Sequence, residues 1–163
     1  MNPRELAGHI RNGPVKLMLD KPLRFRRRSR SSPCDFNELL QALQSSETIR
    51  TVACKSQLRL GITEDEWVLL VKTIGSIKGI QNMRFSYSYS PRDFHPLQAV
   101  AEAVNNAHSL RELVVEIRSE MRNETFPGDS SGLTALANAL RKHTSLQEFS
   151  LIDRRSPLEA TQS

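Results

Sequence analysis

The chain repeats one pattern of apolar residues four times, and this repetition limits its fold more than any other feature. Each copy has three apolar residues within five positions, followed six positions later by a second group in which apolar residues recur after three and then two positions. The second groups begin at Ile49, Ile80, Leu110 and Leu146, which are 31, 30 and 36 residues apart. Such a period predicts stacked repeats, because one unit cannot bury its apolar side alone.

Within each copy the apolar period changes from that of a helix to that of a strand. Steps of three and four in residues 133–140 place the apolar side chains along one side of a helix. The alternation at the end of residues 146–151 is typical of a strand. The expected helix caps are Asp35, Thr63 and Asp93, because short polar side chains accept hydrogen bonds from the first free N–H groups.

A helix and a strand that alternate in one direction give a parallel sheet. The motif Leu-x-x-Leu-x-Leu, as in Leu110–Val115, resembles the leucine-rich repeat, and residues 133–140 are similar to the helical half of its ribonuclease-inhibitor-like subclass. The resemblance covers residues 35–153. It implies an α/β leucine-rich-repeat solenoid of about four repeats, with parallel strands on a concave face and helices on a convex face.

The chain departs from that family where each strand ends. The family places Asn or Cys three residues after the last Leu of the motif, where the side chain bonds to exposed backbone. This chain has Gln57, Ser88, Arg118 and Arg154 at those positions. We therefore expect these turns to be supported differently.

Two segments at the ends of the chain lie outside the four repeats. Residues 1–34 are either a basic arm with a capping segment or a degenerate fifth unit, in which Leu6 and Ile10 belong to a helix and residues 15–19 to a strand. Residues 154–163 form a C-terminal tail, too short for another unit. The strand at residues 146–151 should then have an open edge that a partner or further repeats would cover.

Charge is concentrated in the N-terminal segment. Residues 1–34 hold nine Lys and Arg against two acidic residues, a balance of +7, whereas the remaining residues hold 14 against 16, a balance of −2. The basic run consists of Arg24, Arg26, Arg27, Arg28 and Arg30. Three interpretations stay open: a solvated linker, a nuclear localisation signal, or a contact with nucleic-acid phosphates.

No motif with catalytic or metal-binding spacing is present in the sequence, so we expect neither an enzyme nor a cofactor. The four histidines are scattered, and His108 and His143 suit polar roles at helix ends. Cys54 falls at a core position, and two cysteines favour a reducing compartment. No apolar run is long enough for a membrane span. A cytoplasmic or nuclear location without a membrane follows as an expectation.

Binding of another protein is the leading functional hypothesis. Side chains between the core positions of each strand should line one surface, because successive strand residues face opposite sides. The expected contact residues are Thr51, Lys55, Asn82, Arg84, Ser86, Glu112, Val114, Glu116, Glu148 and Ser150. This surface would be basic toward the N-terminal strands and acidic toward the C-terminal strands, a distribution that orients a partner.

Two other interpretations remain. The charges could simply keep the sheet solvated, with Arg84 meeting Glu112 on the neighbouring strand. The alternative function is nucleic-acid binding or nuclear targeting through residues 24–30. Tyr87 and Tyr89 are expected in a loop after the second strand, as further candidate contact residues.

Overall fold

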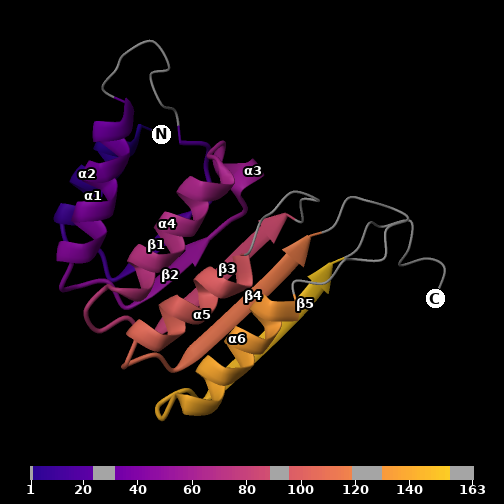
Figure 1. Ribbon diagram of the computed structural model, residues 1–163. Coiled ribbons are helices and arrows are strands. Elements are labelled where there is room, and N and C mark those ends of the chain that lie inside the picture. Colours follow the sequence, from indigo (N-terminus) through magenta and orange to yellow (C-terminus); the bar gives the residue numbers. More distant parts are fainter. Residues whose placement is uncertain (1, 24–31, 89–95, 119–129, 155–163) are drawn as a thin grey trace.

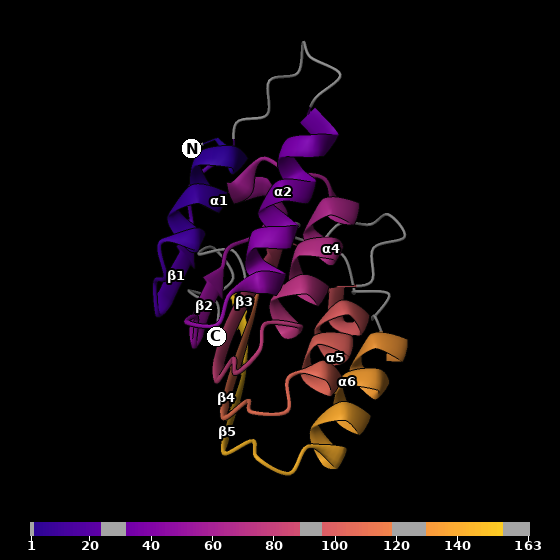
Figure 2. The ribbon, with the colours of Figure 1, turned by 90° about the vertical axis from the view of Figure 1, so that its left-hand side faces the viewer.

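The computed structural model describes residues 2–23, 32–88, 96–118 and 130–154. Within these residues, five strands form one parallel sheet in the order β1-β2-β3-β4-β5, and helices lie as a layer on one of its faces (Figures 1 and 2). The expected α/β class with a parallel sheet is therefore confirmed.

Helices and strands alternate along the chain, with one short extra helix after the second strand. The elements are α1 (Pro3–Arg11), β1 (Lys16–Leu19), α2 (Ser32–Ser45), β2 (Thr51–Cys54), α3 (Gln57–Leu60), α4 (Glu64–Gly75), β3 (Asn82–Ser88), α5 (Pro96–Asn106), β4 (Glu112–Arg118), α6 (Ser130–Lys142) and β5 (Glu148–Arg154).

The four strand junctions use the same backbone hydrogen bonds. The N–H groups of Arg50 and Thr51 both donate to the carbonyl of Val15, with N···O distances of 2.8 and 3.2 Å. One unit later, Gln81 and Asn82 donate in the same way to Arg50. The remaining two junctions have the same pattern. Arg111 and Glu112 donate to the carbonyl of Gln81, and Gln147 and Glu148 donate to the carbonyl of Arg111. The strands of the different units therefore begin with the same pattern of backbone hydrogen bonds, although their sequences differ.

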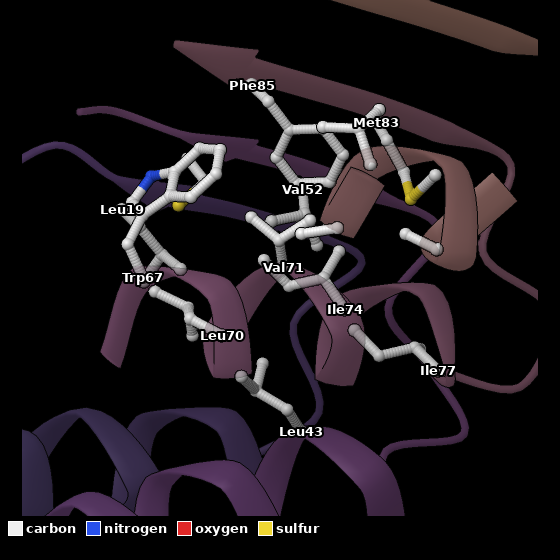
Figure 3. Packing of buried hydrophobic residues seen from close by; sticks show 14 of the residues in the cluster. Leu19, Leu43, Val52, Trp67, Leu70, Val71, Ile74, Ile77, Met83 and Phe85 are labelled. Carbon is white, nitrogen blue, oxygen red and sulfur yellow. The ribbon is translucent and has the colours of Figure 1, made fainter. Parts of the chain in front are cut away.

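The expected core positions lie side by side across the sheet. Val52 pairs with Met83, Met83 with Leu113, and Leu113 with Phe149. The first three side chains are fully buried, whereas Phe149 on the outer strand β5 is 40% exposed. Side chains from α4 point toward this row from the helix layer, as Figure 3 shows for Val71 and Ile74. The core positions of the four units therefore align across the strands as the repeat predicts, and this row is partly exposed at β5.

The N-terminal segment forms a helix and a strand. Leu6 and Ile10 of α1 are buried, and Leu17 of β1 pairs with Val52 of β2. This helix and strand extend the parallel sheet by one strand before β2, and whether they are a degenerate repeat or a capping segment stays a prediction. The basic residues 24–30 lie outside the described residues.

Helix starts agree with the sequence in one case and differ in another. Thr63 and Glu66 form the expected capping box of α4, with the Thr63 hydroxyl accepting from the Glu66 N–H at 3.1 Å and the Glu66 carboxylate accepting from the Thr63 N–H at 2.9 Å. The prediction of Asp35 as a cap is wrong, because α2 already begins at Ser32. A proline in the first helical turn, here Pro33, favours that earlier start. Asp93 lies outside the described residues.

The expected loop position of Tyr87 is also wrong. Strand β3 continues to Ser88, and the Tyr87 side chain is only 3% exposed. Its ring packs edge-on against Trp67, with 5.9 Å between the ring centroids. The inward alternation of Met83 and Phe85 thus continues for one more step, because the Trp67 indole provides an apolar partner there. Tyr89 lies outside the described residues.

Gln57 supports the turn where the repeat family would place Asn or Cys. Its side chain is buried, its amide nitrogen donates to the carbonyl of Ser88 at 2.9 Å, and its amide oxygen accepts from the Ser88 N–H at 3.3 Å. One amide therefore satisfies both backbone groups of the residue that ends β3. Gln57 therefore bonds to backbone through an amide one methylene longer than that of Asn.

We predict that Gln57→Ala lowers the free energy of unfolding by about 1–3 kcal/mol, because it leaves the buried backbone groups of Ser88 without this partner. Urea unfolding followed by circular dichroism measures the change. Leu58→Ala in the same short helix is the control, since Leu58 is 67% exposed and should change stability by less than about 0.5 kcal/mol. Equal stability of both variants would contradict the role of Gln57.

Candidate protein-binding surface

The face of the sheet opposite the helix layer, here called the open face, carries the predicted contact residues. No described helix packs on it (Figure 2). Strand register aligns its side chains in rows across the sheet. One row is Lys16, Thr51, Asn82, Glu112 and Glu148, and the next is Met18, Ala53, Arg84, Val114 and Ser150.

Neighbours in the first row are close enough to bond. The Asn82 side-chain amide donates to the Thr51 hydroxyl at 3.0 Å, so these two half-buried side chains hold each other in place. Glu112 is half-buried, and Glu148 at the outer strand is exposed. This row therefore runs from neutral hydrogen-bonding groups to two carboxylates.

Arg84 is the exposed cation of the second row. It lies between half-buried Val114 on β4 and buried Ala53 on β2, and Ser150 beyond Val114 is exposed. Among the ion pairs between described residues, none joins Arg84 to Glu112. The guanidinium of Arg84 is thus presented to solvent instead of being held by its predicted strand neighbour.

The prediction of Ser86 and Glu116 as exposed contact residues is wrong. Both side chains are 2% exposed, and they pair with each other in the strand register. The Arg118 guanidinium, two residues farther along β4, lies 3.3 Å from a Glu116 carboxylate oxygen. Residues two apart on a strand share a face, so Arg118 offsets the carboxylate charge. Most of the exposed contact candidates therefore lie in the half of the open face where the strands begin, and Arg118 is exposed near the strand ends.

The charge distribution across the strands follows the expected direction, with the exception of exposed Arg118 on β4. Lys16 is exposed on β1, Arg84 is exposed on β3, and half-buried Lys55 follows β2. Glu112 and Glu148 belong to β4 and β5. Lys16 and Glu148 thus lie on the two outer strands of this five-stranded surface, whereas Arg84 and Glu112 lie on the adjacent strands β3 and β4. With strands about 4.8 Å apart and a screening length of about 8 Å in physiological salt, Arg84 on β3 lies within or near that length of Glu112 and Glu148, whereas Lys16 on β1 lies beyond it from both.

Lys16 and Met18 are contact candidates that sequence reasoning missed. Met18 is 48% exposed, and both residues continue the rows of the open face by one strand. The alternation of Leu17 and Leu19 was the signal that could have found them. That alternation is a weak signal because the strand has only four residues.

The histidines and Cys54 have structural surroundings. His108 and His143 line the same polar hollow of about 210 Å³, although they are 35 residues apart. Both ring nitrogens of His143 contact backbone, with Nε2 2.6 Å from the Ala107 carbonyl and Nδ1 accepting from the Leu146 N–H at 3.2 Å. That agrees with a polar role at a helix end. Burial raises the pKa of the Cys54 thiol far above its usual value, so the thiol stays protonated as part of the core.

Other functional signals can be stated for the described part of the chain alone. There, no three His, Cys, Asp or Glu side chains converge as a metal site would require. None of the helices in the described ranges has the length and apolar character needed to cross a bilayer. The candidate nucleic-acid or targeting residues, Arg24, Arg26, Arg27, Arg28 and Arg30, lie outside those ranges, and their role stays a prediction.

Comparisons with known proteins add no assignment to this geometry. No known protein family, curated protein or solved structure matches the chain. Function therefore has to be argued from the open face and its charges.

Proposed function

We propose that this chain is a leucine-rich-repeat solenoid of the ribonuclease-inhibitor-like kind that binds another protein through the open face of its sheet, without catalysis. The repeated strand junctions and the helix layer on one face support this assignment. A preformed sheet surface suits protein recognition because little conformational freedom is lost when a partner docks.

The separation of charge on the open face carries the proposal. Arg84 is exposed and outside any ion pair with Glu112, and Glu148 presents a carboxylate two strands away. Had these charges served solvation alone, we would expect opposite charges to be interspersed and paired across adjacent strands. The partner we propose has an acidic group facing Arg84 and a basic group facing the Glu112 and Glu148 end.

We predict that Arg84→Glu slows association with that partner by about tenfold or more, because like charges then meet as the surfaces approach. Partners are first isolated with the unaltered protein by affinity purification and mass spectrometry. Association rates are then measured by surface plasmon resonance at several salt concentrations. The difference between the variants should shrink as salt rises.

Lys78→Glu is the matched control, since it makes the same charge change at an exposed turn away from the open face. Glu112→Lys tests the acidic end in the same assay. If folded Arg84→Glu and Glu112→Lys both bound every isolated partner as the unaltered protein does, the open face would not be the binding surface.

A further inference from the structure

Exposed apolar side chains gather at the two ends of the sheet. Seven large apolar residues in the described part of the chain are exposed, and five of them belong to its first or last unit. These are Val15 and Met18 beside β1, and Leu133, Phe149 and Leu151 on α6 and β5. Apolar surface that gathers in this way marks an interaction site more often than scattered single residues do.

At the β5 end, two side chains that pair with core residues of β4 are themselves partly exposed to solvent. Leu113 and Val115 of β4 are fully buried, but their register partners Phe149 and Leu151 are 40% and 43% exposed. In the inner units such positions are covered by elements on both sides. Phe149 and Leu151 have a neighbour on the β4 side, and no described strand pairs with the outer edge of β5.

At the β1 end, the outer edge borders a hollow of about 260 Å³. Its apolar lining consists of Leu6 from α1, Leu17 and Leu19 from β1, and Leu23. Lys16 and Met18, from the opposite face of the same strand, line it as well. A hollow lined from both faces of one strand lies at the strand edge, where another strand can add by backbone pairing.

We propose that the β5 end of one copy of this chain docks on the β1 end of a second copy, so that one parallel sheet continues across both molecules. Continuing the observed register places Phe149 beside Leu17, Leu151 beside Leu19, and Glu148 beside Lys16 of the next copy. The exposed side chains of Phe149 and Leu151 then gain cover at the hollow beside β1, whose own leucines Leu17 and Leu19 are already 2% exposed.

The charges of Lys16 and Glu148 favour pairing of β5 with β1 over pairing of two β5 strands. Lys16 and Glu148 are exposed ends of one row, and in that row neighbouring side chains reach each other, as the 3.0 Å bond between Asn82 and Thr51 illustrates. An opposite-charge pair therefore forms at the new junction. Pairing of β5 with a second β5 would bring two like-charged strands together and leave the β1 edge uncovered.

The contact joins two different surfaces, so it extends into chains unless the rotation between copies closes a ring. It shares Lys16 and Glu148 with the open face but does not use Arg84, so Arg84→Glu, which should leave self-association unchanged, distinguishes the two proposals.

Sedimentation velocity over a range of concentrations at low salt tests the proposal with the full chain. We expect the mean mass of the unaltered protein to rise beyond that of a dimer. Lys16→Glu and Glu148→Lys should each weaken self-association by about tenfold or more, because each places like charges at the junction. An equimolar mixture of the two variants should associate again, since each junction between unlike copies is then matched.

Phe149→Asp should also abolish association while leaving the circular dichroism unchanged, since the side chain is already 40% exposed. Leu69→Asp is the matched control, because Leu69 is 49% exposed on α4, away from both ends, and the variant should associate normally. A single monomeric species at every concentration would overturn the proposal. Association of Lys16→Glu at unaltered strength would overturn it too, and would point to contact between two β5 strands.

Discussion

Replacing Trp67 by alanine is expected to lower the free energy of unfolding by about 3–5 kcal/mol, a loss typical of large aromatic side chains removed from a core. The indole of Trp67 is fully buried on the sheet side of α4 (Figure 3). Its ring centroid lies 6.4 Å from that of Phe85 and 5.9 Å from that of Tyr87, both in edge-on geometry. The variant therefore leaves a cavity and removes two aromatic contacts at once.

The indole also donates a hydrogen bond from Nε1 to the Lys55 carbonyl, at 3.1 Å. Trp67→Phe removes this hydrogen bond but keeps an aromatic ring in the core. We expect it to lower the free energy of unfolding by less, about 1–3 kcal/mol. Urea unfolding followed by circular dichroism measures both variants. Leu69→Ala in the same helix is the control, with an expected change below about 0.5 kcal/mol because Leu69 is 49% exposed. A loss of less than about 1 kcal/mol for Trp67→Ala would contradict the packing of this aromatic cluster.

The second large effect is expected at Gly75, the last residue of α4. A Cβ atom there would lie 2.4 Å from the Ala103 Cα and 2.7 Å from its carbonyl oxygen. Side-chain rotation cannot relieve contacts with backbone, so α4 and α5 would have to move apart. We expect Gly75→Ala to cost about 3 kcal/mol and to lower the Tm by about 6–12 °C for a chain of this length.

Gly8 provides a control of opposite sign. It lies within α1, and a Cβ atom added there would meet nothing within 4 Å. Gly8→Ala should therefore stabilise the protein by about 0.5–1 kcal/mol, the ordinary gain in helix propensity. Differential scanning calorimetry of the two variants compares them directly. If Gly75→Ala raised the Tm as Gly8→Ala does, the close approach of α4 to α5 would be refuted.

The row alignment of the open face followed from the sequence alone. Apolar residues at fixed offsets in the units fixed which residue of each strand faces the helices, and the residues between them had to face the other way. For that reason the register of Thr51, Asn82, Glu112 and Glu148 agrees with the expectation residue by residue. The capping box of Thr63 and Glu66 was readable for the same reason, because both partners lie within one helical turn.

Predictions failed where the deciding contact joins residues far apart in the chain or competes with a local alternative. Tyr87 is held in β3 by Trp67, twenty residues earlier, and Glu116 is buried beside Ser86 of the neighbouring strand although alternation alone would expose it. Gln57 bonds to the backbone of Ser88 across 31 residues, and although the repeat marks its position, the spacing does not identify its partner. The N-terminal strand could not be assigned from periodicity because it has only four residues, and its place in the sheet depends on pairing with β2.

The sequence by itself determined the order of helix and strand, the parallel sheet and the inward side of each strand, since these follow from periodicity along the chain. Tertiary structure decided which of the outward residues stay accessible, which polar side chains hold the turns, and which ends of the sheet remain uncovered. Accessibility depends on what packs against a residue from other units, and hydrogen-bond partners depend on distances between strands. Neither quantity is encoded in the spacing of residues along a single segment.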